Sequence, residues 1–171
     1  MKIRLMAAAV MIMMIAGMES CSTKSCSKVT CGLNQVCNNG QCFCNNGYEG
    51  DSCNKLSYPK FIGTYFVNET CNGTGGSSYT AYITQGSTDV SSLDITNFLG
   101  QFTVRAYIRS TVDKKGTYLE IPDQTLGGTS DNMINGQGNF EYVGAQQRIV
   151  LNVNYRLNST DRACSHVFYK Q

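Results

Sequence analysis

The chain has 171 residues, among them nine cysteines, two prolines, one histidine and no tryptophan, and only 15% of its residues are charged. So many cysteines in a short chain indicate an oxidising compartment, because cytosolic reductants keep thiols reduced. The formal net charge is +2. A near-neutral chain lacks the dense positive charge that nucleic-acid binding requires, so nucleic acid is excluded as a partner.

The first twenty residues have the character of a targeting segment. Lys2 and Arg4 precede a wholly apolar run from Leu5 to Gly17, which is 13 residues long. That run is too short to cross a bilayer as a helix and is typical of the apolar part of a signal peptide. Six of the seven methionines lie before Ser20, so the composition changes there. We therefore predict a signal peptide over residues 1–20.

The residues that follow the apolar run resemble the cleavage box of bacterial lipoproteins. The segment reads Gly17-Met18-Glu19-Ser20-Cys21, and the small Ser20 directly precedes the cysteine, although Met18 and Glu19 depart from the usual pattern. The resemblance implies that Cys21 carries a lipid and that residues 21–25 form a tether to the membrane. The alternative is ordinary signal-peptidase cleavage nearby, with Cys21 free or paired between chains.

Residues 26–53 contain six cysteines, the first being Cys26 and the last Cys53, and too few apolar residues to form a core. Disulfides must therefore stabilise this stretch, although the spacing alone leaves many connectivities open. The spacing resembles an epidermal-growth-factor-like (EGF-like) domain, and residues 42–53 match that family's C-terminal signature. The resemblance implies three disulfides: Cys26–Cys37, Cys31–Cys42 and Cys44–Cys53.

Local sequence supports a small β-structure in this module and narrows its function. Asn39-Gly40 favours a type I′ turn between strands near residues 35–38 and 41–44. Family members that bind calcium carry acidic residues before the first cysteine, where this chain has Ser22 to Ser25, and receptor agonists carry arginine where it has Ser52. We expect a rigid spacer or an adhesion module at residues 26–53, the spacer being favoured, without a metal or other cofactor.

A linker over residues 54–59 leads into a second domain, residues 60–171, with alternating apolar and polar residues. Residues 102–109, for example, place Phe102, Val104, Ala106 and Ile108 on one face. Turn-forming residues separate such runs, which predicts an all-β fold. Short connections favour an antiparallel eight-stranded up-and-down β-barrel, with a β-sandwich as the alternative. We expect strands near residues 61–71, 78–85, 91–98, 101–109, 116–121, 133–142, 147–157 and 163–170.

The two remaining cysteines, Cys71 and Cys164, fit the closure of this barrel. Cys71 ends the first expected strand and Cys164 begins the last. The first and last strands of a closed eight-stranded meander run antiparallel, so the end of one meets the start of the other. A disulfide between Cys71 and Cys164 would join the two edges, and the chain-entropy model gives it about 4 to 5 kcal/mol of stabilisation.

The segment Phe61-Ile62-Gly63-Thr64-Tyr65 resembles a weakened Gly-x-Trp motif of lipocalins, with Tyr65 in place of tryptophan. This resemblance implies a lipocalin-like barrel, whereas the alternative is that Gly63 only relieves crowding at a strand bend. Arg105 and Arg109 lie on the outward face of their strand, so we expect a soluble barrel, not one spanning an outer membrane. The aromatic residues are expected mostly to fill the core: Tyr65, Tyr79, Phe102, Phe140, Tyr155 and Phe168.

The sequence offers little for catalysis. His166 is the single histidine, no second histidine or free cysteine is left for a zinc site, and no nucleophile-elbow sequence accompanies it. We therefore expect His166 to be structural. Asp94, Glu120 and Glu141 could serve as paired carboxylates of a hydrolase. They lie on different expected strands without a recognisable motif, so we predict that the chain is not an enzyme.

These observations favour a non-catalytic lipoprotein of the cell envelope, anchored in the outer membrane or at the cell surface, whose barrel binds a protein or a small apolar ligand. One alternative is a secreted eukaryotic adhesion or matrix glycoprotein, since Asn68, Asn72 and Asn158 each begin an Asn-x-Thr sequon. A carboxylate-dependent hydrolase is the second alternative.

Overall fold

The computed structural model describes residues 26–171 except residues 73 and 112–116. Cys21, the signal peptide and the tether therefore lie outside the described residues. A small disulfide-rich part contains η1 (Cys26–Lys28), β1 (Gln35–Asn38), β2 (Gln41–Cys44), β3 (Tyr48–Glu49) and β4 (Lys55–Leu56), and η2 (Tyr58–Lys60) connects it to the barrel. The barrel strands are β5 (Gly63–Cys71), β6 (Thr74–Gln85), β7 (Ser92–Phe98), β8 (Phe102–Ser110), β9 (Thr117–Leu126), β10 (Thr129–Val143), β11 (Gln146–Leu157) and β12 (Thr160–Lys170).

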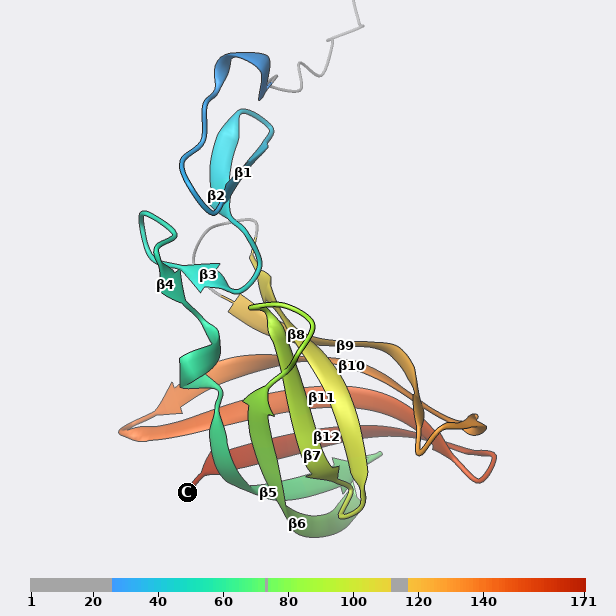
Figure 1. Cartoon of the computed structure of the whole chain (residues 1–171). Helices are drawn as coiled ribbons and strands as arrows, with labels where there is room; N and C mark the ends of the chain where they lie inside the picture. Colours follow the sequence, from blue (N-terminus) through green and yellow to red (C-terminus); the bar gives the residue numbers. More distant parts are fainter. Residues whose placement is uncertain (1–25, 73, 112–116) are drawn as a thin grey trace, which may run out of the picture.

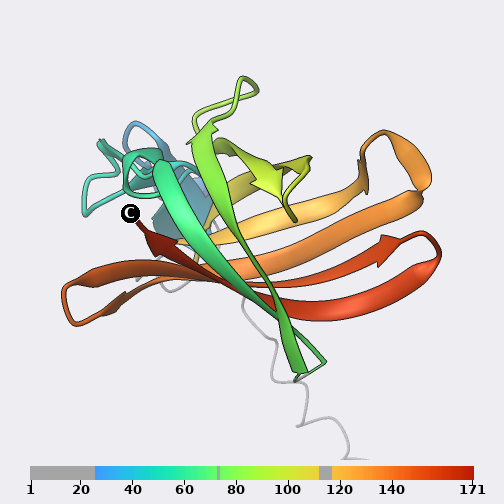
Figure 2. The same cartoon turned by 90° about the horizontal axis from the view of Figure 1, so that it is seen from below.

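The eight long strands form a closed antiparallel barrel, which confirms the predicted fold class (Figure 1). Each strand pairs with its neighbours in sequence, and β12 pairs with β5 to close the circle. Strand β5 pairs with β12 on one side and with β6 on the other, and Figure 2 shows these strands from below. The β-sandwich alternative is therefore excluded for this domain.

Strict alternation of apolar and polar residues determines which side chains fill the barrel. In β5, for instance, Tyr65 and Val67 are fully buried and Phe66 between them is exposed. A hollow wide enough for water would leave accessible surface on the side chains around it, yet the interior residues have almost none. The barrel core is therefore packed, with these among its fully buried members: Phe61, Tyr65, Ile83, Leu93, Ile95, Phe98, Ile108, Leu119, Ile121, Leu126, Ile134 and Phe168.

Strand β9 runs five residues beyond its expected end at residue 121, through Pro122. Its pairing with β10 is irregular at this point, because the register shifts between Ile134 and Gly136. A bulge of this kind tolerates a proline, which cannot donate to a regular ladder. The side chain of Gln124 then bonds the backbone of Arg105 in β8, accepting from its N–H at 2.9 Å and donating to its carbonyl at 2.7 Å. An amide side chain thus replaces backbone pairing between β8 and β9.

Two glycines of β10 allow the sheet to curve tightly. Gly136 and Gly138 lie opposite Val153 and Leu151 of β11. A Cβ on Gly136 would lie 2.5 Å from the Asn152 carbonyl oxygen and 2.6 Å from Val153 Cγ1. Both distances are below van der Waals contact, so the close approach of β10 to β11 requires glycine here.

The disulfide-rich part is held by three bonds, Cys26–Cys37, Cys31–Cys42 and Cys44–Cys53. Strands β1 and β2 form one antiparallel pair and β3 and β4 a second. Asn39 and Gly40, between β1 and β2, both have positive φ values, 49° and 73°, as a type I′ turn requires. This part lies above the end of the barrel at which β5 begins (Figure 1).

Direct contacts fix the small part to the barrel. The Ser110 N–H at the end of β8 donates to Asn46 Oδ1 at 3.2 Å, and in the connecting segment the Ser57 N–H donates to the Gly47 carbonyl at 2.9 Å. Lys60 and Glu49 form an ion pair across the junction. Gly47 packs so closely that a Cβ there would lie 2.9 Å from the backbone of Val90. The expected linker is therefore part of a docked junction.

Phe61 closes this end of the barrel. It directly follows η2, has no exposed surface, and packs edge-on against Phe140 with ring centroids 5.4 Å apart. The Tyr65 hydroxyl donates to the Phe61 carbonyl at 2.7 Å. Among the helices of the described residues, none is long and apolar enough to cross a membrane.

Replacing Gly136 with alanine should lower the free energy of unfolding by about 1 to 3 kcal/mol, because overpacking displaces β10 from β11. Gly75→Ala is the matched control, since a Cβ there meets nothing within 4 Å. Urea denaturation of both variants measures the difference. Equal stabilities would contradict the close-approach explanation.

Removing the Cys71–Cys164 disulfide as the double Ala variant should lower the free energy of unfolding by about 2 to 5 kcal/mol, since the bond closes a loop with a sequence separation of 93 residues. Far-ultraviolet circular dichroism at low denaturant should remain that of a β-barrel, because the β5–β12 ladder keeps its backbone hydrogen bonds. A variant as stable as the parent would show that the bond contributes nothing to closure.

Candidate functional site

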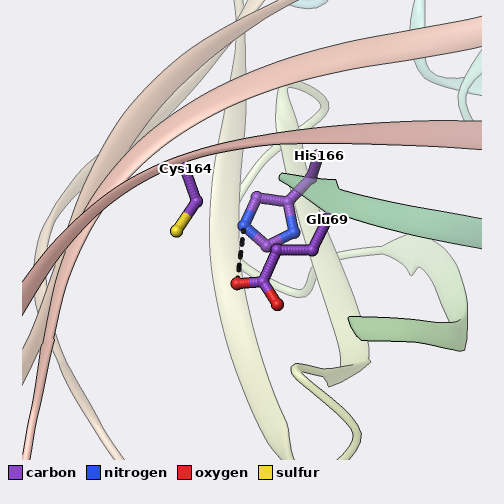
Figure 3. A group of neighbouring side chains, drawn as sticks. All are labelled: Glu69, Cys164 and His166. Atoms are coloured by element: carbon purple, nitrogen blue, oxygen red, sulfur yellow. Dashed lines mark ion pairs between the residues drawn. The ribbon is translucent and has the colours of Figure 1, made fainter. Parts of the chain in front are cut away.

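A group of polar side chains lies inside the barrel where β5 meets β12. The register places Cys164 opposite Cys71 and His166 opposite Glu69. Alternation directs all four side chains inward, and Cys71 and Cys164 form a disulfide. We call Glu69, His166, Tyr79 of β6 and Tyr155 of β11 the seam cluster. Figure 3 shows His166 and Glu69 facing each other beside Cys164.

Glu69 is a nearly buried carboxylate, 7% exposed, whose two oxygens both accept hydrogen bonds. Tyr155 Oη donates to Oε1 at 2.7 Å, and Ser77 Oγ donates to Oε2 at 2.7 Å. Burial alone would raise the pKa of Glu69, but the hydrogen bonds from Tyr155 and Ser77 and the influence of His166 outweigh it and lower the pKa. Glu69 is therefore ionised at neutral pH.

His166 has no exposed surface, and its ring packs against Phe98 with centroids 5.0 Å apart. Its Nδ1 lies 3.1 Å from Tyr79 Oη, and its Nε2 lies 3.8 Å from Glu69 Oε1. Burial lowers the pKa of His166 to about 4, although the charge of Glu69 opposes the shift. A neutral imidazole therefore lies beside a carboxylate at neutral pH.

Both tyrosines of the cluster remain protonated. Burial raises the pKa of Tyr155 to about 12, with a further increase from its hydrogen bond to Glu69, and burial also raises that of Tyr79. The charge of Arg162 opposes this increase in the pKa of Tyr155.

The seam cluster does not have the donors for a metal centre. One potential ligand atom each from Glu69, Cys164 and His166 lies within 4.8 Å of the others. The Cys164 sulfur is bonded to Cys71, however, and a disulfide sulfur is not the thiolate that a metal requires. Two donors remain, fewer than the three or four protein ligands of a zinc site.

Solvent reaches parts of the cluster but not His166, which is fully buried. A surface hollow of about 500 Å³ at the barrel end is lined by Glu69, Ser77, Thr160, Asp161 and Arg162 among others, but not by His166. A general base must come within hydrogen-bond reach of its substrate. His166 is enclosed by the core, so the arrangement suits a structural polar cluster that supports the barrel seam.

The structure separates the carboxylates considered from the sequence. Asp94 pairs with Arg105, Glu120 with Arg109 and Glu141 with Arg148. All six residues lie on outward positions of β7 to β11, and each carboxylate meets its own arginine. No two of these three carboxylates form a pair across a cleft, as glycoside hydrolysis would require.

The sequon asparagines lie near the end of the barrel that carries the Cys71–Cys164 disulfide. Asn72 and Asn158 are exposed in turns and have positive φ values of 50° and 49°. Asn68 is on the outward face of β5, where its Oδ1 accepts from Ser78 Oγ at 2.9 Å. The turn positions account for Asn72 and Asn158 structurally, since asparagine tolerates this backbone conformation.

Sequence reasoning missed Glu69, the most highly connected residue of the cluster. A signal was present, because side chains alternate between the two faces of a strand. Glu69 therefore shares the inward face of β5 with Tyr65, Val67 and Cys71. A carboxylate on the apolar face of an amphipathic strand indicates a buried polar contact. The partners Ser77 and Tyr155 come from other strands, so no local pattern identifies them.

Comparisons with known proteins provide no family for this chain. No family model and no curated protein matches it. A solved structure from Bacteroides ovatus, described as of unknown function, is similar with a TM-score of 0.29 and 14% identity over 65% of this chain. The match covers 42% of that protein's chain.

The free energy of unfolding should fall as the pH is lowered from about 6.5 to about 4. In this window the unfolded chain protonates a histidine of pKa 6.5, whereas the folded chain keeps His166 neutral down to about 4. His166→Gln retains a polar amide without a titrating ring and should flatten this slope. Urea denaturation at several pH values measures both proteins, and identical slopes would refute the burial of a neutral His166.

Proposed function

We propose that the protein is a non-catalytic lipoprotein of the cell envelope, anchored through Cys21, that presents its β-barrel to a partner. The observation that carries this proposal is the packed barrel: its interior has no room for a substrate or ligand, so recognition falls to the outer surface. The buried position of His166, the single histidine, supports the absence of catalysis.

In this proposal residues 26–53 are an EGF-like spacer. The three disulfides join first with third, second with fourth and fifth with sixth cysteine, the order that the resemblance implies. The contacts of Ser57, Asn46 and Lys60 with their partners support a stiff connection. A stiff module next to a membrane tether would hold the barrel away from the membrane surface in a fixed orientation.

The barrel has the strand number and meander of a lipocalin-like domain, but its packed core distinguishes it from a carrier of small apolar molecules. Lipocalins hold ligands inside the barrel. Here Phe61 closes one end, and aromatic contacts such as Tyr65–Phe168, with ring centroids 5.9 Å apart, occupy the interior. We therefore favour a macromolecular partner at the outer face over an apolar ligand within.

The anchor is tested by expressing the full chain in a Gram-negative bacterium and analysing the mature N-terminal peptide by mass spectrometry. We expect the mature chain to begin at an acylated Cys21 and to fractionate with membranes, and Cys21→Ser to lose both properties. The other eight cysteines form four disulfides. The denatured, unreduced protein should therefore contain no free thiol. An unmodified Cys21, or cleavage beyond it, would overturn the anchoring proposal.

A further inference from the structure

The outward surface formed by β5, by β6 from Ser78 and by β12 from Ser165 carries no charged side chain. The ion pairs Asp94–Arg105, Arg109–Glu120 and Glu141–Arg148 lie across β7 to β11, and Arg156–Asp161 joins β11 to the start of β12. The surface begins at residue 64 in β5, at residue 78 in β6 and at residue 165 in β12. Every outward residue of this surface is uncharged. They are Thr64, Phe66, Asn68, Thr70, Ser78, Thr80, Tyr82, Thr84, Ser165, Val167 and Tyr169.

Three aromatic residues occupy neighbouring register positions on this surface. Phe66 is opposite Tyr169 in the β5–β12 ladder, and Tyr82 is two residues from Thr80, the partner of Phe66 in β6. Phe66 and Tyr82 are therefore diagonal neighbours, a position within reach of aromatic side chains. Phe66 is 42% exposed and Tyr82 47%. We call Phe66, Tyr82, Tyr169 and the flanking Thr64 and Thr80 the aromatic face.

Hydroxyl groups surround these rings. Thr64 and Thr96 lie on either side of Tyr82 in the neighbouring strands, and Thr80 lies beside Phe66. Each hydroxyl can donate one hydrogen bond and accept others. The surface thus combines flat apolar rings with hydrogen-bonding groups, and it lacks fixed charges at its centre.

This chemistry selects among possible partners. An anionic membrane or an acidic polymer would need basic side chains, which the aromatic face lacks. A peptide cannot add to the sheet as an extra strand, because a closed barrel has no free edge. A sugar ring has an apolar face of C–H groups that stacks on an aromatic ring and a rim of hydroxyls that pairs with threonine hydroxyls.

We infer that the aromatic face binds a neutral polysaccharide, with sugar rings stacked on Phe66 and Tyr82. Tyr169 extends the row across a third strand, so the platform spans about two strand spacings, roughly 10 Å. This inference rests on the proposed function, since it names the partner to which the anchored barrel is presented.

The test measures binding of the detergent-solubilised full chain to soluble β-glucan, xylan and galactomannan, with polygalacturonate as a charged control, by isothermal titration calorimetry. We expect at least one neutral polysaccharide to bind and polygalacturonate not to bind. Phe66→Ala and Tyr82→Ala should each weaken binding about tenfold, because each removes a stacking ring. Tyr142→Ala is the matched control: Tyr142 is 64% exposed but lies on β10, outside the aromatic face.

Several outcomes would overturn the inference. Failure of all three neutral polysaccharides to bind would do so, as would unchanged affinity in both Phe66→Ala and Tyr82→Ala. A dimer in analytical ultracentrifugation that dissociates in Tyr82→Ala would assign the aromatic face to a second copy of the chain. Thermal melting of each variant checks that it is folded. Acylation of Cys21, measured on the same preparation, separates failure of the anchor from failure of sugar binding.

Discussion

The antiparallel pairing of β12 with β5 is the contact on which the rest of the structure depends. Without it the eight strands would form an open sheet with two exposed edges, which invites pairing with other chains. Backbone hydrogen bonds from residue 65 to residue 71 make the closure, and the Cys71–Cys164 bond makes it covalent. Burial of the whole aromatic and aliphatic core follows from this one ladder.

The polar residues at the seam show how a buried charge is accommodated. Glu69 has no cationic partner within the cluster, because His166 is neutral at physiological pH. Its charge is instead compensated by the hydroxyls of Tyr155 and Ser77. The cluster is not fully bonded, because the buried Nε2 of His166 has no hydrogen-bond partner among the described residues. It ties β5, β6 and β11 together at the point where the barrel closes.

Much of this architecture could be predicted from the sequence, because period-two alternation depends on local residues. The positions of Cys71 and Cys164, at the end of the first expected strand and the start of the last, placed both at the seam. Contacts between residues far apart in the sequence were not predictable. One is the hydrogen bond from Gln124 to β8 after the bulge at Pro122, and others are the contacts of Asn46 and Glu49 that join the small module to the barrel. Glu69 was missed, although its position in the alternation of β5 could have shown that it points inward. Its partners Tyr155 and Ser77 lie on other strands and could not be found in this way.

The spacing of the disulfides imposes an order on maturation. The bonds of the small module join cysteines 9 to 11 residues apart, whereas Cys71 and Cys164 are 93 apart. In a chain exported from its N-terminus, the module can be oxidised while the barrel is still being translocated. The seam cysteine in β12 emerges only after the module and the strands β5 to β11. Truncation near the C-terminus, or premature pairing of Cys71 with a module cysteine, would therefore leave a correctly oxidised module attached to a sheet that cannot close.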